Sequence, residues 1–354
     1  MNKVKKNNEL EFFFVCLKIG IGALIYRGGI EVLSYALLPF VNLLMMIAPE
    51  NVVFVNSLSY IYTAIVSVLA FLLAAIMLWI SLRIGKRRNY QPTYWRWKLT
   101  LFAPFLIVAT VALNFAMAEI NALMISLLTP GVGVGLSISA GADISIIEVV
   151  LLLISTAVIP GIVEEIMFRG IILTNLSPYG KGMAIVCSAL LFGLMHMNPS
   201  QFFYTTLMGL ILGYIYVRTR SIWICIIIHF TNNALGVVQQ IIYQCNDTGR
   251  ADELMSQMMI IVAVLGLLSI GTLLIVRAVN RRKPPEETGS FGRLYESSLS
   301  YEAVPLAKSK KMLLFFSPSV SLFTVIVFAS MITAMVGLFI AGLILGILPG
   351  MITM

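Results

Sequence analysis

Residues 145–173 read SIIEVVLLLISTAVIPGIVEEIMFRGIIL, an apolar run long enough to cross the ~30 Å hydrocarbon core of a bilayer. Three charged side chains, Glu164, Glu165 and Arg169, interrupt its second half. An ionisable side chain at the bilayer centre costs about 2.5–3.5 kcal/mol on insertion scales. Several such residues on one helix therefore indicate a functional site inside the membrane.

The composition of the whole chain is that of an integral membrane protein. Of its 354 residues, 59% are hydrophobic and 11% are charged, whereas soluble domains are about half apolar and a quarter charged. We expect an all-α, polytopic membrane protein with roughly eight to nine transmembrane helices and the active site inside the helical bundle. Candidate spans lie near 29–48, 57–82, 99–128, 145–173, 182–197, 200–217, 221–243, 257–279 and 313–347.

The distribution of lysine and arginine predicts the orientation of these spans. Basic residues cluster at 3–6, 83–98, 181, 218–220 and 277–311. The loops expected between these clusters, around residue 50 and at 129–143, 198–199 and 244–256, contain no basic residue except Arg250 and are expected to be external. Because basic loops stay in the cytoplasm, we expect a cytoplasmic N-terminus in a bacterial cell membrane, and an entrance to the site near Ser177 and Ser221. The net charge of +8 is then explained by contact with anionic lipid, and no nucleic-acid partner is expected.

Three regions follow from this reading. Residues 1–144 hold about three N-terminal spans and a basic cytoplasmic loop, residues 145–243 form a catalytic core, and residues 244–354 hold C-terminal spans with a polar cytoplasmic linker at 280–311. Residues 10–27 are expected to be either an interfacial helix or an extension of the first span. The glycine-rich stretch 131–135 lacks the Gly-Lys-Ser/Thr ending of a phosphate-binding loop and is expected to be an external loop.

Helical spacing assigns faces to the polar residues of the core. Glu165 and Arg169 are i, i+4 and are expected to pair, whereas Glu164 points about 100° away and is free to face a cavity. The only two histidines of the chain, His196 and His229, end or occupy the apolar runs that follow.

Asn233 shares the helical face of His229 and completes the set. Its neighbour Asn232 is expected to contact another helix. A carboxylate, two imidazoles and a carboxamide are thus expected to converge from three helices.

This set suits attack of water on an amide. Glu164 is expected to act as the general base, with His196 orienting the water or sharing its proton. His229 and Asn233 are expected to donate hydrogen bonds to the oxyanion. Glu164, His196 and His229 are equally a possible zinc set, since two histidines and one glutamate hold catalytic zinc elsewhere.

At these residues the sequence resembles the CPBP intramembrane proteases, which include CAAX prenyl endopeptidases and bacteriocin-processing and immunity proteins. The family motifs are E-E-x-x-x-R, F-x-x-x-H and H-x-x-x-N. They correspond here to Glu164-Glu165-Ile166-Met167-Phe168-Arg169, Phe192-Gly193-Leu194-Met195-His196 and His229-Phe230-Thr231-Asn232-Asn233.

The resemblance covers about residues 145–243 and implies a membrane endopeptidase. It assigns catalytic roles to Glu164, His196, His229 and Asn233 and supporting roles to Glu165 and Arg169. It favours a reaction that requires no cofactor, although zinc or another divalent metal is possible. The expected partners are the lipid bilayer and a membrane-associated peptide or protein substrate.

Two other classes of function fit the same residues. In a proton-coupled transporter, Glu164, His196 and His229 would form a proton relay. A non-catalytic immunity or binding protein would keep the fold and hold a peptide without cutting it. The sequence does not identify the substrate, and the prenyl specificity of relatives is not transferred to this chain.

Overall fold

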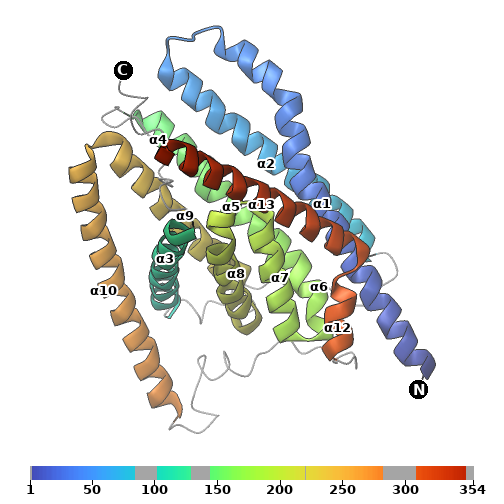
Figure 1. Cartoon of the computed structure of the whole chain (residues 1–354). Coiled ribbons are helices and arrows are strands. Elements are labelled where there is room, and N and C mark those ends of the chain that lie inside the picture. Colours follow the sequence, from blue (N-terminus) through green and yellow to red (C-terminus); the bar gives the residue numbers. More distant parts are fainter. Residues whose placement is uncertain (1, 84–101, 129–143, 220, 282–307, 348–354) are drawn as a thin grey trace.

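The computed structural model of the chain describes residues 2–83, 102–128, 144–219, 221–281 and 308–347 (Figure 1). Every regular element in these ranges is a helix, so the expected all-α fold is confirmed. The helices are α1 (Asn2–Met45), α2 (Val52–Arg83), α3 (Ala103–Leu128), α4 (Ile146–Leu153), α5 (Ile159–Glu165), α6 (Thr174–Leu176), α7 (Lys181–Met195), α8 (Pro199–Thr219), α9 (Ile222–Cys245), α10 (Thr248–Arg281), α12 (Lys308–Phe315) and α13 (Pro318–Ile347).

Several helices are long and apolar enough to cross a membrane. Within the described ranges, five meet both criteria: Val52–Leu82, Ala103–Leu123, Ile146–Tyr179, Ile222–Cys245 and Thr248–Val279. The segments Lys181–Met195 and Pro318–Thr333 are apolar but shorter. The chain is therefore a polytopic membrane protein, and the number of roughly eight to nine crossings stays a prediction.

The long helix that carries the charged cluster begins at a capping box. The Ser145 hydroxyl accepts a hydrogen bond from the Glu148 backbone N–H at 3.2 Å, and the Glu148 carboxylate accepts one from the Ser145 N–H at 2.9 Å. Glu148 also accepts a bond of 2.7 Å from the Asn56 amide on α2. From this start, α4, α5 and α6 follow one another with π-helical segments between them, at Ile154–Val158 and Ile166–Leu173.

Some element boundaries differ from those expected. Residues 10–27 belong to α1, which runs without interruption from Asn2 to Met45 and is not among the five helices that meet both span criteria. The external loop expected at 244–256 is almost entirely helical. There α10 begins at Thr248, where the Asp247 carboxylate accepts a hydrogen bond from the Arg250 N–H at 3.1 Å and so caps the helix.

The C-terminal segment also differs from expectation. The two ends of the linker expected at 280–311 are helical, because α10 continues to Arg281 and α12 begins at Lys308. Its middle, 282–307, lies outside the described residues. The last span begins at Pro318, after the break at Ser317, and not at 313. The glycine-rich stretch 131–135 is also outside the described residues, and the division into three regions stays a prediction.

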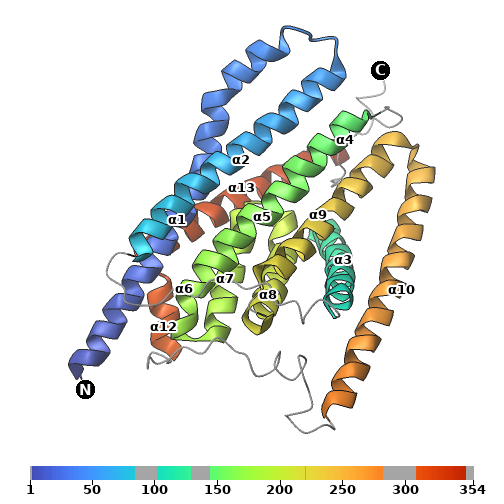
Figure 2. The ribbon, with the colours of Figure 1, turned by 180° about the vertical axis from the view of Figure 1, so that it is seen from behind.

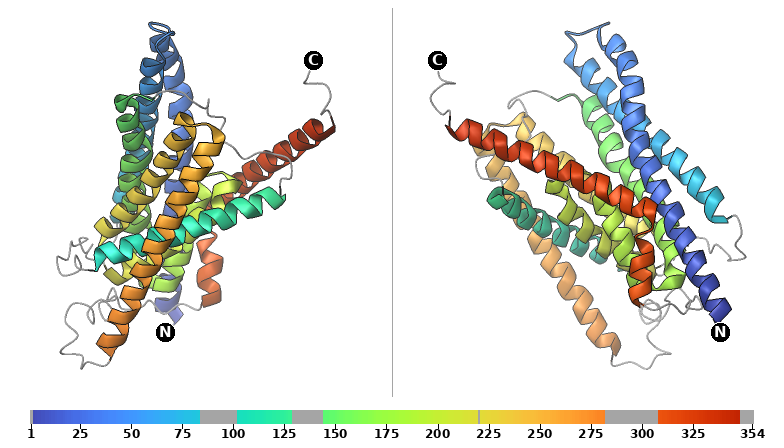
Figure 3. Two further views of the ribbon diagram at one scale, coloured as in Figure 1. Left: turned by 90° about the vertical axis from the view of Figure 1, so that its left-hand side faces the viewer. Right: turned by 45° about the vertical axis from the view of Figure 1, so that its right-hand side comes forward.

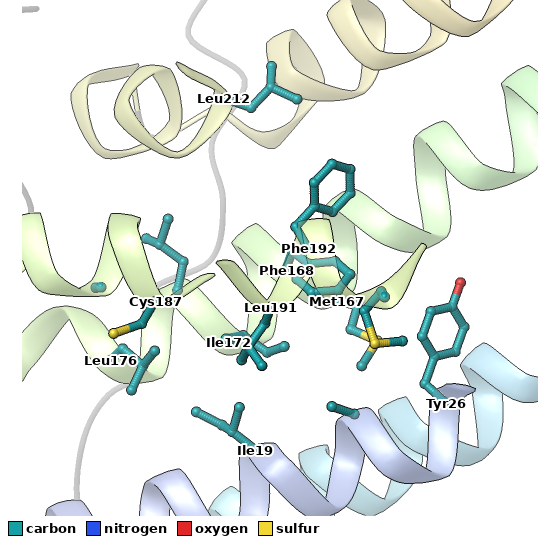
Figure 4. Close-up of a cluster of buried hydrophobic side chains, with 14 of the residues drawn as sticks. Ile19, Tyr26, Met167, Phe168, Ile172, Leu176, Cys187, Leu191, Phe192 and Leu212 are labelled. Carbon is teal, nitrogen blue, oxygen red and sulfur yellow. The ribbon is translucent and has the colours of Figure 1, made fainter. Parts of the chain in front are cut away.

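The long α4–α6 helix lies in the centre of the bundle, with neighbouring helices on both of its sides. Seen from behind, α2, the α4–α6 helix and α9 run side by side (Figure 2). On the opposite face α13 crosses the bundle obliquely (Figure 3), and the Ser319 hydroxyl donates to the Leu17 carbonyl of α1 at 2.8 Å. Between them lies the apolar core, in which Ile19 and Tyr26 of α1 face Met167 and Ile172 (Figure 4).

Close packing of α7 against α8 depends on glycines. A Cβ atom added at Gly209 would lie 2.9 Å from the Cα atom of Ala189, and one at Gly193 would lie 3.0 Å from the Phe202 carbonyl oxygen. Real Cβ atoms do not approach backbone this closely, so glycine is required where the two helices touch. This contact fixes the position of His196 at the end of α7 relative to α8.

Candidate active site

Glu164 and Glu165 are the last two residues of α5, and Arg169 lies in the π-helical segment that follows. π-Helical turns are rare and are frequent at functional sites, because they rotate the side chains that come after them. Here the Thr174 hydroxyl donates to the Arg169 carbonyl at 2.9 Å, five residues back along the chain. The polar cluster therefore sits where the long helix departs from regular geometry.

Glu165 is the centre of a buried network. Its Oε1 atom accepts a hydrogen bond from Arg169 Nη1 at 2.7 Å, and the two side chains are 0% and 1% exposed. The ion pair expected from their i, i+4 spacing is present. The same Oε1 atom lies 2.8 Å from His229 Nδ1 on α9. Because an ionised carboxylate can only accept, Nδ1 is the donor, and His229 Nε2 is directed away from Glu165.

Glu164 faces the other way, as expected from helical rotation. Its side chain is 19% exposed, and its Oε2 atom lies 3.9 Å from His229 Nε2, which is beyond hydrogen-bond distance. In the part of the chain that the structure describes, Oε2 has no hydrogen-bond partner. Two atoms 3.9 Å apart can both contact a single water molecule at about 2.8 Å. The carboxylate of Glu164 is therefore available to a reactant.

His196 lies at the C-terminal end of α7, as predicted. Its Nδ1 atom is 2.9 Å from the Phe192 carbonyl oxygen, and since a carbonyl only accepts, Nδ1 carries the proton and Nε2 is free to accept. The Phe192 ring packs edge-on against both imidazoles, with centroid distances of 5.2 Å to His196 and 5.8 Å to His229. Phe192 thus fixes the orientation of the two histidines that it separates.

Phe192 also contacts the buried cation. The guanidinium carbon of Arg169 lies 4.6 Å from the centroid of the Phe192 ring, within the range of a cation–π interaction. Arg169 Nη2 reaches the Gly209 carbonyl of α8 at 3.4 Å. Arg169 therefore joins the helix of the glutamates to α7 and α8 as well as neutralising Glu165.

Asn233 is held by the other π-helical segment. Its amide donates to the Thr156 carbonyl at 3.0 Å, and Thr156 lies within Ile154–Val158. An amide nitrogen has two N–H groups, so one remains for a second acceptor. The neighbouring Asn232 contacts other helices, as expected: it bonds to Asn114 on α3 and to the Tyr204 hydroxyl on α8.

The four candidate catalytic residues line one cavity. It has a volume of about 390 Å³ and lies between α5, α7, α8 and α9. Glu164, His196, His229 and Asn233 all contribute to its wall, together with Thr156, Gln201, Tyr204, Thr205 and Gln240. Glu165 and Arg169 lie behind this wall and do not line it. Residues from three separate motifs thus share one hollow inside the bundle.

The cavity wall does not form a metal site. Within the described ranges, no three His, Cys, Asp or Glu side chains are arranged to hold a metal ion. The alternative zinc set of Glu164, His196 and His229 is therefore not assembled in this structure, and we derive no step through a metal.

The structure does not show an opening at Ser177 and Ser221, where an entrance to the site is expected. These two side chains are 4% and 1% exposed, and they are packed among buried apolar residues. The expectation used distance along the chain from the basic loops, which does not report how the ends of the helices pack.

Sequence reasoning missed several residues of the site. Thr156 contributes a backbone carbonyl, for which no side-chain signal exists. Tyr204 and Asn114 join a hydrogen-bond network with Asn232, and a polar residue inside an apolar span was the available signal for Asn114.

Comparisons with known proteins find similarity in the segment that carries the site. Residues 146–235 match the family described as type II CAAX prenyl endopeptidase Rce1-like, which confirms the resemblance to the CPBP proteases for that segment. The chain is 33% identical over 104 residues to "Putative membrane peptidase YdiL" of Bacillus subtilis (strain 168). That alignment covers 28% of this chain and 42% of the relative, so the chain matches less than half of the relative's length. No solved structure matches.

Proposed function

We propose that the chain is an intramembrane endopeptidase that hydrolyses a peptide bond with activated water, since residues 146–235 match the Rce1-like family. The observation that carries the proposal is that Glu164, His196, His229 and Asn233 line a single cavity of about 390 Å³. A carboxylate base, two imidazoles and an amide donor are the groups that amide hydrolysis requires.

Water is activated by Glu164 with help from His196. The Glu164 Oε2 atom accepts one proton of the water, because it has no other partner among the described residues. His196 presents Nε2 as an acceptor, because Nδ1 is committed to the Phe192 carbonyl. It orients the second proton of the water, so that the oxygen lone pair points at the scissile carbonyl.

The oxyanion is stabilised by His229 and Asn233. In its doubly protonated form His229 donates from Nδ1 to Glu165 and from Nε2 into the cavity. Asn233 donates its second amide hydrogen, the first being bound to the Thr156 carbonyl. Donors held in this way need no reorganisation during the reaction, which is where their stabilisation of the transition state originates.

Glu165 and Arg169 act on the orientation of His229. The buried pair sets the direction of the imidazole through the bond of 2.8 Å from Nδ1 to Glu165. Arg169 balances the charge of Glu165. The carboxylate of Glu164 is then the one of the two that is available to accept a proton from water.

The protein works in a membrane that we take to be a bacterial cell membrane, as the Bacillus subtilis relative suggests. Its N-terminus and the basic ends of its helices face the cytoplasm. Its substrate is a membrane-associated peptide or protein, because the cavity lies among helices whose outer faces are apolar and exposed.

The test is cleavage by purified protein in liposomes. A library of apolar peptides with mixed polar flanks is incubated with the wild type and with Glu164→Gln, and products are identified by mass spectrometry. We expect products that the Glu164→Gln variant does not form. The matched control is Glu253→Gln, an exposed carboxylate on α10 outside the cavity, which should cleave like the wild type.

Two results would contradict the proposal. Products formed equally by wild type and Glu164→Gln would mean that the cavity is not the site of cleavage. Proton-coupled flux across the liposome membrane, abolished by Glu164→Gln and without any cleavage, would favour the proton relay of a transporter.

A further inference from the structure

The cavity extends from the candidate catalytic residues mainly in one direction. On the long helix its wall continues from Glu164 back to Pro160 and Thr156, toward the Ser145 end. On α9 it continues from His229 forward to Gln240, about 16 Å farther at 1.5 Å per residue.

The other two helices agree with this direction. The residues that α8 contributes, from Gln201 to Met208, belong to the half that begins at Pro199, and α7 contributes Phe192 and His196 at its far end. In all four helices this is the end opposite to Lys181 and Arg218.

The basic end of the core is closed by packing. Leu176 and Tyr179 at the end of the long helix are buried, and the Tyr179 ring lies 4.4 Å from that of Phe12 on α1. The Thr174 hydroxyl of α6 and the Tyr216 hydroxyl of α8 are hydrogen-bonded at 3.0 Å. Among the residues that the structure describes at this end, none lines the cavity.

The opposite end of the cavity reaches the surface. Gln201 and Gly236 are exposed and Gln240 is half-buried, and all three line the cavity. The connection between α7 and α8 at this end is short, because α7 ends at Met195 and α8 begins at Pro199. Arg27 of α1 contacts this turn, with its Nε atom 2.8 Å from Met197 Sδ. Met197 has a φ of 49°, which is uncommon for a residue with a side chain and marks a tight turn.

We propose that the site receives its substrate from the non-cytoplasmic half of the membrane, as a peptide segment at or just beyond the external surface. This inference rests on the proposed function and on the cytoplasmic location of the basic helix ends. The substrate class is then a membrane-anchored peptide with its scissile bond on the external side, and not a lipidated tail in the cytoplasm. The glutamines that line the mouth suit a polar, extended backbone, because carboxamides both donate and accept hydrogen bonds.

Cysteine labelling tests the side of access without reference to activity. Three of the four cysteines, Cys16, Cys187 and Cys225, are buried, and Cys245 is exposed. In a Cys245→Ser background, Gln240→Cys is treated in intact cells with a membrane-impermeant maleimide. The matched control is Arg218→Cys at the basic end of α8.

We expect Gln240→Cys to be labelled equally before and after the cells are permeabilised, and Arg218→Cys to be labelled only afterwards. Gln201→Cys, at the same mouth, repeats the test if the first variant is poorly expressed. Labelling of the mouth positions only after permeabilisation, or from neither side, overturns the inference.

The same variants separate this inference from the proposed function. In liposomes sorted by the side on which the mouth position is labelled, a water-soluble peptide added outside should be cleaved only when the mouth faces outward. The maleimide adduct at Gln240→Cys should block that cleavage. If no peptide is cleaved in either orientation the proposed function fails, while the labelling pattern still decides the side of access.

Discussion

Replacing Glu165 should damage the protein in a different way from replacing Glu164, although the two residues are adjacent. In Glu165→Gln the Oε1 position loses the charge that accepts from Arg169 at 2.7 Å and contacts His229 at 2.8 Å. Arg169 stays 1% exposed and keeps only the Gly209 carbonyl at 3.4 Å and the Phe192 ring. Removing one partner of a buried pair costs roughly 3–5 kcal/mol, so the free energy of unfolding should fall by about that amount.

Glu164→Gln should leave the fold intact. The Oε2 atom of Glu164 has no hydrogen-bond partner in the described ranges, so its charge supports no contact that the amide would break. The cleavage rate should fall by about 10²–10⁴, the usual effect of losing a general base. The measurements are chemical unfolding of the purified variants in detergent and the initial rate of peptide cleavage.

A double variant separates stability from activity. Glu165→Gln with Arg169→Met removes both buried charges, and such replacement is often neutral for stability, so unfolding should return toward that of the wild type. Cleavage should stay low, because a neutral amide oxygen accepts from His229 Nδ1 more weakly than the carboxylate does and holds the imidazole less firmly. A different result would exchange the two roles: Glu165→Gln unfolds like the wild type but is inactive, while Glu164→Gln still cleaves. It would refute the inference that Glu164 faces the reactants and Glu165 faces Arg169.

Three further changes have defined outcomes. Asn233→Ala should reduce the cleavage rate by about 10²–10³, as for loss of an oxyanion donor, with a small change in melting temperature; an unchanged rate would remove Asn233 from the site. Gly209→Ala should lower the melting temperature, because the new Cβ would lie 2.9 Å from the Ala189 Cα, and a variant as stable as the wild type would show that α7 and α8 can separate at no cost. Treatment of the active protein with a strong chelator should leave cleavage unchanged, and restoration of a lost rate by zinc would contradict the metal-free reaction.

The local part of the site could be predicted from the sequence. The pairing of Glu165 with Arg169 depends only on the i, i+4 geometry of a helix, and it is present although the helix becomes π-helical beyond Glu165. The different direction of the Glu164 side chain, which does not contact Arg169, has the same origin. Short-range rules succeed here because the partners share one helix.

The contacts between helices could not be predicted. The bond between His229 and Glu165 depends on how α9 packs against α5, and no spacing along the chain encodes that geometry. The position of the cavity mouth could not be predicted for the same reason. The burial of Ser177 and Ser221 follows from packing at the helix ends, which the sequence does not encode. The polar sequence at 244–256 predicts a loop, whereas Asp247 caps α10 and the helix begins at Thr248.

The buried network explains how a membrane protein can keep several ionisable groups together. Glu165 and Arg169 cancel each other in charge, and His229 binds the same oxygen atom, so these groups satisfy one another out of contact with lipid. In the described ranges the Oε2 atoms of both glutamates lack a hydrogen-bond partner, but only Glu164 lines the cavity. Because an unpaired buried charge costs several kcal/mol, such a residue persists where a reactant or water completes its coordination. The position of Glu164 in the cavity wall and the bonds of Glu165 Oε1 to Arg169 and His229 thus follow from one helical rotation of about 100° between adjacent residues.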